Sequence, residues 1–263
     1  MQKKARLGQN FLVDADACRS VVAALGNIRD EAVVEIGPGR GALTRQLARA
    51  AGHLTLLEFD PSLAGALLVE FASTPTVEVR HADVLTVDFD ALSQEQGRKL
   101  VVVGNLPYYI TSDILLHLVD HHAAIDRAVL MVQREVAERV TATPGTRDYG
   151  VLSATMQLYG EAELLFTLPP GAFAPPPEVY SSVFRFHVRP RFAEMGVEPA
   201  RFLPFVRASF AQKRKTWANN LRAAGYKAEA VGAALANNRV SPAVRAEAVG
   251  LTDMAAVFSA LHA

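Results

Sequence analysis

Glu35-Ile36-Gly37-Pro38-Gly39-Arg40-Gly41-Ala42 directly overlaps the end of the apolar run Ala32–Ile36 and opens a helix-like segment. Glycines at a strand-to-helix turn let the backbone approach a ligand closely, at the edge of a parallel sheet where such folds bind nucleotides. The next strand-like run ends in Glu58, 17 residues beyond Gly41, where a carboxylate can accept hydrogen bonds from ribose hydroxyls. This stretch therefore predicts a nucleotide-binding α/β fold.

A third strand end points to the same ligand, because Val77–Arg80 is followed by His81-Ala82-Asp83, which offers an acceptor for an adenine amine. The glycine turn also fits the dinucleotide fingerprint G-x-G-x-x-[GA], so a dehydrogenase is one alternative. Nothing in the last third of the chain resembles a second nucleotide-binding half, which counts against that alternative. A non-enzymatic RNA-binding module is the other alternative, and it predicts binding without catalysis.

Asn105-Leu106-Pro107-Tyr108 ends the apolar run Leu100–Gly104 and combines an amide, a fixed carbonyl and an aromatic ring. Proline lacks an N–H and biases Leu106 toward an extended conformation, so the Leu106 carbonyl and the Asn105 side chain can point the same way. Two such acceptors suit the exocyclic amine of a nucleobase, and Tyr108 could stack on that base. We call these four residues the acceptor cradle.

Apolar strand-like runs alternate with helix-like segments through the first two-thirds of the chain. The expected strands are Ala32–Ile36, Leu54–Glu58, Val77–Arg80, Leu100–Gly104, Ala128–Gln133, Glu163–Leu168 and Ser182–Val188, and the expected helices are Leu43–Ala51, Ser62–Phe71, Ser112–Asp120 and Arg134–Val140. Alternation of this kind predicts a mostly parallel sheet covered on both faces. The proline-rich segment 169–177 is expected to close a hairpin between the last two strands.

No strand is expected from about Glu198 onward. Amphipathic patterns over Ala228–Ala236 and Met254–Leu261 predict helices instead, after the linker Arg189-Pro190. We therefore expect a catalytic domain over residues 1–190 and a small helical domain over residues 191–263.

Composition limits the class of protein further. A single cysteine, Cys18, excludes an internal disulfide and is typical of a reducing compartment. No apolar stretch is long enough to span a bilayer, so we expect a cytoplasmic protein without a membrane partner. The seven histidines form no ligand cluster, and the pair His121-His122 lacks a nearby cysteine, so no metal is expected.

The net charge is zero, with 27 basic and 27 acidic residues, but the charges are unevenly distributed. Residues 31–135 carry a net charge of −6, whereas residues 136–263 carry +4. Between residues 201 and 222 there are six basic side chains and no acidic one: Arg201, Arg207, Lys213, Arg214, Lys215 and Arg222. A block of one sign is a candidate surface for a polyanion, although a solvated helix face would look the same.

As an ordered set, the motifs closely resemble the ribosomal small-subunit RNA adenine N6,N6-dimethyltransferases, the KsgA family. The matching stretches are Leu7-Gly8-Gln9-Asn10-Phe11-Leu12, Glu35–Gly41, Glu58, Asp83, Asn105–Tyr108, Gly171–Pro177 with Ser181-Ser182-Val183, and Lys213-Arg214-Lys215. The resemblance covers nearly the whole chain. It implies a Rossmann-like S-adenosylmethionine-dependent methyltransferase fold with a seven-stranded, mostly parallel sheet and a small all-helical C-terminal domain.

The resemblance also implies site residues. Asn10 and Leu12 would close over S-adenosylmethionine, Gly37 and Gly39 would contact its methionine part, Glu58 its ribose and Asp83 its adenine, with Asn105 beside the reacting methyl group. The cradle residues Asn105, Leu106, Pro107 and Tyr108 would hold the target amine, and Phe173 would stack on the opposite side of the base. Lys213, Arg214, Lys215 and Arg222 would contact RNA. The implied reaction is dimethylation of two adjacent adenosines in the 3'-terminal hairpin of small-subunit rRNA, within an immature subunit, by a monomer.

One departure from the family pattern affects the RNA side. Glu178 stands where many relatives carry a basic residue, which removes a phosphate contact. Leu106 stands where the macrolide-resistance methyltransferases of large-subunit rRNA usually have isoleucine. The helical C-terminal stretch with Lys213-Arg214-Lys215 resembles the small-subunit enzymes better, so the resistance type is the second choice.

Overall fold

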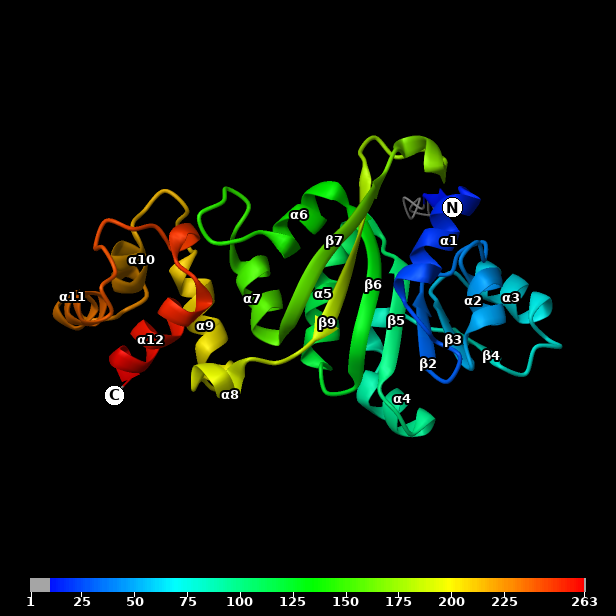
Figure 1. The fold of residues 1–263 in the computed structure, drawn as a ribbon, viewed down its shortest axis with the longest axis horizontal. Coiled ribbons are helices and arrows are strands. Elements are labelled where there is room, and N and C mark those ends of the chain that lie inside the picture. Colours follow the sequence, from blue (N-terminus) through cyan, green and yellow to red (C-terminus); the bar gives the residue numbers. More distant parts are fainter. Residues whose placement is uncertain (1–9, 263) are drawn as a thin grey trace, which may run out of the picture. The chain divides into compact units, whose positions relative to one another are not determined.

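The computed structural model describes residues 10–262, and these divide into two compact units (Figure 1). The first unit combines the chain up to Ala137 with Glu163–Val188, and the second combines Glu138–Ala162 with the residues from Arg189 onward. The predicted division was a single cut after residue 190. The structure places residues 138–162 with the C-terminal helices instead, and the functional labels given to the two parts stay predictions.

The first unit is built on a seven-stranded sheet in the order β4-β3-β2-β5-β6-β9-β7. Its strands are β2 (Ala32–Ile36), β3 (His53–Glu58), β4 (Val77–His81), β5 (Leu100–Asn105), β6 (Ile125–Gln133), β7 (Gly160–Leu168) and β9 (Ser181–Val188). Strands β2 to β6 pair in parallel, whereas β9 runs antiparallel to β6. The Rossmann-like α/β fold is confirmed, and so is the hairpin of β7 and β9.

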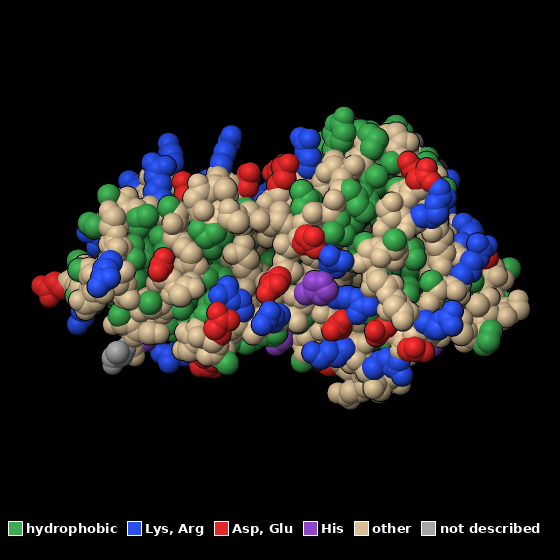
Figure 2. Space-filling model, in the orientation of Figure 1, with side chains coloured by type: hydrophobic (Ala, Val, Ile, Leu, Met, Phe, Trp, Pro, Cys, Tyr) green, Lys and Arg blue, Asp and Glu red, His purple; other side chains and the backbone are tan. Residues whose placement is uncertain are grey.

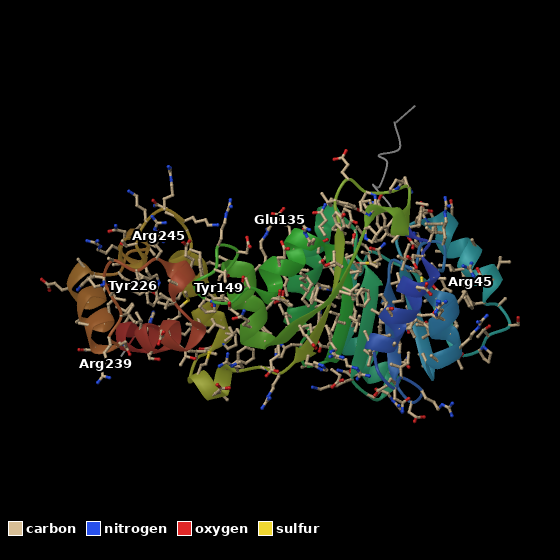
Figure 3. The ribbon with its side chains drawn as sticks, turned by 45° about the horizontal axis from the view of Figure 1, so that its top comes forward. Arg45, Glu135, Tyr149, Tyr226, Arg239 and Arg245 are labelled. Carbon is tan, nitrogen blue, oxygen red and sulfur yellow. The ribbon has the colours of Figure 1, made fainter. Side chains whose placement is uncertain are left out.

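One helix precedes the first strand of the large sheet and the others follow its strands, as in other α/β folds. They are α1 (Ala15–Ala24), α2 (Thr44–Ala50), α3 (Pro61–Glu70), α4 (Phe89–Gln96), α5 (Thr111–Asp120) and α6 (Arg134–Thr141). Three aspartates, Asp14, Asp60 and Asp88, accept backbone N–H bonds at the starts of α1, α3 and α4. Figure 3 labels Arg45 on α2, which pairs with Glu70 of α3 at 2.6 Å.

The strand register gathers the predicted site residues at one edge of the sheet. Ile36 lies opposite Leu57 on β3 and opposite Gly104 on β5, and Glu58 lies opposite His81. Because these strands are parallel, their carboxyl ends meet at the same edge, and the glycine turn, Glu58 and the acceptor cradle follow there.

A second, two-stranded sheet joins distant parts of the first unit. Strand β1 (Phe11–Leu12) pairs antiparallel with β8 (Phe173–Ala174), and the N–H groups of Val13 and Asp14 donate to the Ala172 carbonyl at 2.9 and 3.3 Å. The segment that opens the described chain is therefore fixed to the loop between β7 and β9.

The second unit is helical and has a core of its own. It contains α7 (Val151–Tyr159), α8 (Phe192–Met195), α9 (Pro199–Ser209), α10 (Trp217–Ala223), α11 (Ala228–Asn237) and α12 (Leu251–His262). Trp217 is fully buried against Phe205, and its indole N–H donates to Ser209 Oγ at 2.8 Å. The two helices expected from periodicity lie within α11 and α12. Over residues 10–262, no helix has both the length and the apolar composition needed to cross a bilayer.

Candidate functional site

A cavity of about 310 Å³ opens at the carboxyl edge of the sheet in the first unit. Nine of the predicted site residues line it: Asn10, Gly37, Gly39, Glu58, Asp83, Asn105, Leu106, Pro107 and Tyr108. This volume lies at the lower end of the range for small-molecule sites. Around one cavity, the structure thus brings together Asn10, from the segment before β1, and residues at the carboxyl ends of the neighbouring strands β2, β3, β4 and β5.

The glycine turn needs its glycines for two different reasons. Gly37 and Gly39 have φ angles of +64° and +58°, in the left-handed region that side chains with a Cβ rarely adopt. A Cβ on Gly39 would also lie 2.9 Å from the ring of Phe11. The Arg40 guanidinium lies 4.5 Å from the centre of the same ring. Phe11 is therefore held against the turn, and this contact brings β1 to the cavity.

Glu58 is only 3% exposed and its carboxylate already holds two backbone groups. Oε2 accepts from the Gly39 N–H at 2.9 Å, and Oε1 accepts from the Asp60 N–H at 2.8 Å. A carboxylate has about four acceptor positions, so both oxygens can take a further hydrogen bond from the cavity. Glu58 thus fixes the glycine turn in addition to the predicted ribose contact, a role that the sequence did not indicate.

Asp83 lies at the far end of the cavity, after β4. Its Oδ1 accepts from the Leu85 N–H at 3.0 Å and begins a short 3₁₀ turn over Val84–Thr86. Two aromatic residues that sequence reasoning missed also line the cavity, Phe59 and Tyr109, which are 54% and 62% exposed. Phe59 directly follows Glu58 and Tyr109 directly follows Tyr108. No spacing or composition in the sequence distinguishes these two residues as part of the site.

The acceptor cradle is held by backbone contacts on two sides. Asn105 donates from Nδ2 to the Asn10 carbonyl at 2.9 Å, which leaves its Oδ1 as the acceptor atom for another partner. The Leu106 N–H donates to the Met131 carbonyl at 2.9 Å, which ties the cradle to β6. The Thr111 hydroxyl donates to the Pro107 carbonyl at 2.9 Å. The amide orientation that the cradle requires is therefore set by the segment before β1.

Tyr108 is held by its hydroxyl, which lies 2.7 Å from Ser181 Oγ at the start of β9. Ser181 is completely buried, and partial burial raises the pKa of the Tyr108 phenol despite this hydrogen bond. Because the hydroxyl end is fixed, the ring cannot turn freely, and a fixed ring is the form that stacking on a base requires.

Leu12 and Phe173 do not line this cavity. They lie opposite each other across the β1–β8 pair and are 5% and 3% exposed, within the apolar core. Leu12 borders a second, smaller cavity of about 30 Å³, which also touches Gly37 and Asn105. The stacking role of Phe173 stays a prediction, and it requires the ring to leave the core.

Glu35 is a buried carboxylate beneath the glycine turn. Burial raises its pKa to about 8, and the nearby Glu58 adds to the rise, whereas the Thr44 hydroxyl, donating to Oε2 at 2.7 Å, opposes it. An acid whose folded-state pKa is raised keeps a proton that the unfolded chain has lost.

The pKa of Glu35 leads to a prediction on stability. Between pH 4.5 and about 8 the folded state holds one more proton than the unfolded state, so the free energy of unfolding should fall as the pH rises. A Glu35→Gln variant should lose this dependence, up to about 1.4 kcal/mol per pH unit. Denaturant unfolding of both proteins at several pH values checks it, and identical slopes would contradict it.

The predicted RNA-binding residues lie in the second unit. Lys213, Arg214 and Lys215 are exposed in the loop between α9 and α10, and Arg222 is exposed on α10. Lys213 donates from Nζ to the Arg147 carbonyl at 3.2 Å, so part of its role is to hold that loop. The stretch Leu7-Gly8-Gln9 and the basic residues Lys3, Lys4 and Arg6 lie outside the described residues.

One group of side chains within the described residues has the composition of a metal site. Asp88, Asp90 and His121 each offer an atom within 4.8 Å of the others. Asp90 Oδ2 already lies 2.6 Å from His121 Nδ1, and Asp88 accepts the Ala91 N–H at the start of α4. These bonds account for the group without an ion, and the absence of a metal stays an expectation.

Comparison with known proteins gives consistent matches over the whole chain. The family model described as ribosomal RNA adenine dimethylase matches residues 1–262. The ribosomal RNA small subunit methyltransferase A of Acidobacterium capsulatum is 57% identical over 259 residues, which cover 98% of this chain and 91% of the relative. The protein of the same name from Koribacter versatilis is 49% identical over 271 residues, with 99% and 95% covered.

Two solved structures have a similar fold over nearly the whole chain. The 23S rRNA methyltransferase ErmE superposes with a TM-score of 0.74 at 28% identity, covering 97% of this chain and 100% of that one. A dimethyladenosine transferase from Plasmodium falciparum superposes with a TM-score of 0.77 at 20% identity, with 94% and 95% covered. The second likeness supports the fold alone.

Proposed function

Because this chain belongs to the ribosomal RNA adenine dimethylase family, we propose that it transfers methyl groups from S-adenosylmethionine to N6 of two adjacent adenosines in small-subunit rRNA. The observation that carries the proposal is that the acceptor cradle and the buried carboxylate of Glu58 line the same cavity. The names of the two relatives described above support the small subunit as the target. The proposal further places the two adenosines in the 3'-terminal hairpin and takes an immature subunit as the substrate. It also assumes that the enzyme is a cytoplasmic monomer.

The cavity suits S-adenosylmethionine. The left-handed Gly37 and Gly39 leave room for its methionine part, Glu58 can accept from the ribose hydroxyls, and Asp83 can accept from the adenine amine. When bound, the cofactor supplies a methyl group on a positively charged sulfur. Asn10 and Phe11 would cover it, because both line the cavity and Phe11 is packed on the glycine turn.

The chain's own contribution to the reaction is to position the attacking nitrogen. Asn105 Oδ1 and the Leu106 carbonyl accept the two hydrogens of the adenine amine, which draws them out of the ring plane and frees the nitrogen lone pair. Tyr108 stacks on the base. Catalysis by alignment and charge placement needs no strong base, because the proton can leave after the new N–C bond has made the amine acidic.

The experiment is a methylation assay on two RNAs. Purified protein is incubated with labelled S-adenosylmethionine and either immature small subunits or large-subunit RNA, and the modified nucleosides are mapped by mass spectrometry. We expect dimethyladenosine in the terminal hairpin of the small subunit. The second candidate is methylation of large-subunit RNA, favoured by the likeness to ErmE at 28% identity. Dimethyladenosine found only in the large-subunit RNA would establish that candidate.

The basic block of the second unit is proposed to contact RNA phosphates. Residues 31–135 carry a net charge of −6 and would repel RNA, so an attractive surface has to come from elsewhere in the chain. Lys213, Arg214 and Lys215 are exposed and of one sign, which is the pattern of a phosphate-binding surface.

Replacing Lys213, Arg214 and Lys215 with alanine should weaken RNA binding and leave cofactor binding intact. The plot of log affinity against log salt should become flatter by about 2, because each contact to a single strand releases roughly 0.7 counterion. Filter binding over a salt series measures this. Lys227→Ala, which removes an exposed charge at the start of α11, is the matched control. An unchanged slope in the triple variant would mean that the block only solvates its loop.

A further inference from the structure

Tyr180 holds an aromatic ring at the surface of the first unit, immediately before β9. The residue is 48% exposed. Its carbonyl accepts from the Arg134 N–H at 3.0 Å, and the Arg134 guanidinium lies 5.4 Å from the centre of its ring. Arg134, the first residue of α6, therefore contacts both the backbone and the ring of Tyr180, and these contacts restrict the orientation of the ring.

A short series of bonded and adjacent residues connects Tyr180 to the acceptor cradle. In the antiparallel pair of β6 and β9, Gln133 lies opposite Ser181, so Arg134 and Tyr180 are the next residues outward on each chain. The adjacent Ser181 bonds the Tyr108 hydroxyl at 2.7 Å. Met131 of β6 in turn accepts the Leu106 N–H. Tyr180 thus immediately precedes Ser181, the residue that fixes the ring expected to stack on the target base.

The loop around Tyr180 is apolar and conformationally restricted. Three prolines, Pro175–Pro177, precede it, and Val179 beside it is 44% exposed. Figure 2 shows hydrophobic side chains gathered at the tip of the connection that leads into β9 in Figure 1. Prolines restrict the free chain, so a contact made by this loop would lose little conformational entropy on binding.

The charge of this loop indicates which part of an RNA it can meet. Glu178 is exposed two residues before Tyr180, and a carboxylate there repels phosphate. A nucleobase carries no charge, and each base offers a flat face that stacks on an aromatic ring. A base next to the target adenosine therefore fits the loop better than the RNA backbone does.

We propose that Tyr180, supported by Arg134, is a stacking platform for the nucleotide adjacent to the target adenosine. The proposal rests on the proposed function, because it assumes an adenosine of rRNA in the acceptor cradle. Once the target base has left its stack to enter the cradle, its neighbour loses a stacking partner as well. Tyr180 replaces that partner and so adds affinity for an RNA in which the two bases follow each other.

The test is a double-mutant cycle between protein and RNA. The RNA probe is a hairpin with two adjacent adenosines in its loop, prepared also with an abasic site on the 5' or on the 3' side of the target. Tyr180→Ala should weaken binding of the complete hairpin about 5- to 150-fold, the range expected for loss of one base–aromatic stack. For one of the two abasic RNAs, the Tyr180→Ala variant and the wild-type protein should have the same affinity. Tyr180→Phe, which keeps the ring face, should bind the complete hairpin within about twofold of wild type.

The result that overturns the proposal is an equal loss on the complete and on both abasic RNAs, or no loss on any. A loss in Tyr180→Phe as large as in Tyr180→Ala would also overturn it, since the phenol rather than the ring would then matter. Val179→Ala truncates a neighbouring exposed side chain, and its affinities for the three RNAs should equal those of the wild-type protein. Cofactor affinity and the unfolding midpoint of each variant show that it folds. Failure of the wild-type protein to methylate small-subunit RNA would instead refute the proposed function.

Discussion

Replacing Asn105 with alanine is expected to lower the rate of methyl transfer in a single turnover at least 100-fold. Asn105 lines the cavity, and its Nδ2 is committed to the Asn10 carbonyl, so Oδ1 is the atom available for the target amine. Loss of one well-placed polar contact that tightens in the transition state typically costs two to three orders of magnitude. Rapid-quench measurement with saturating cofactor and RNA gives the rate directly.

Two controls separate chemistry from binding and from folding in this variant. Cofactor affinity should fall much less than the rate, because the cradle faces the acceptor. An Asn105→Asp variant keeps an acceptor oxygen but cannot donate to the Asn10 carbonyl, so it tests whether the orientation of the amide matters. Near-wild-type single-turnover methylation by Asn105→Ala would remove the cradle from the mechanism.

Glu58→Ala is expected to weaken S-adenosylmethionine binding by about 1.5–3 kcal/mol, roughly 10- to 150-fold in the dissociation constant. The residue ends β3 and lines the cavity with a buried carboxylate, and hydrogen bonds to a charged acceptor are among the strong ones. Isothermal titration calorimetry with the cofactor measures the change. An unchanged dissociation constant in a folded variant would place the ribose elsewhere.

The double role of Glu58 requires a second variant. Since the carboxylate also accepts from the N–H groups of Gly39 and Asp60, alanine loosens the glycine turn as well as removing a ligand contact. Glu58→Gln keeps the volume and one acceptor oxygen, so it should disturb the turn less. Asp60→Asn, which changes a carboxylate that caps α3 without lining the cavity, should bind the cofactor normally.

Most of the sheet could be predicted because its strands have a strong and simple pattern. Each predicted strand lies within an observed one, and β2 covers the predicted Ala32–Ile36 with every residue buried. Buried parallel strands are continuous apolar runs, and glycine or a carboxylate follows them where ligands bind. For the same reason, the residues around the cavity could be named from the ends of β2, β3, β4 and β5.

The remaining features lack a local pattern. Helix α4 (Phe89–Gln96) is largely polar, and α1 (Ala15–Ala24) follows no expected strand, so neither was predicted. The β1–β8 pair has two residues on each strand, too few for any periodicity. Phe173 is buried by that pairing, so its position depends on Phe11–Leu12, far away in the sequence. The assignment of residues 138–162 to the second unit depends on long-range packing in the same way.

The pairing of β1 with β8 has a consequence for the order in which the protein becomes competent during synthesis. Translation delivers Phe11 early, but its partner Ala174 is made only after six of the seven strands of the large sheet. A nascent chain that ends before Ala172 already contains every residue of the glycine turn and the cradle, yet it lacks the strand partner of Phe11–Leu12 and the carbonyl that accepts from Val13 and Asp14. Anchoring of the segment beside the cavity thus becomes a late event on the growing chain, reached when the first unit is nearly finished.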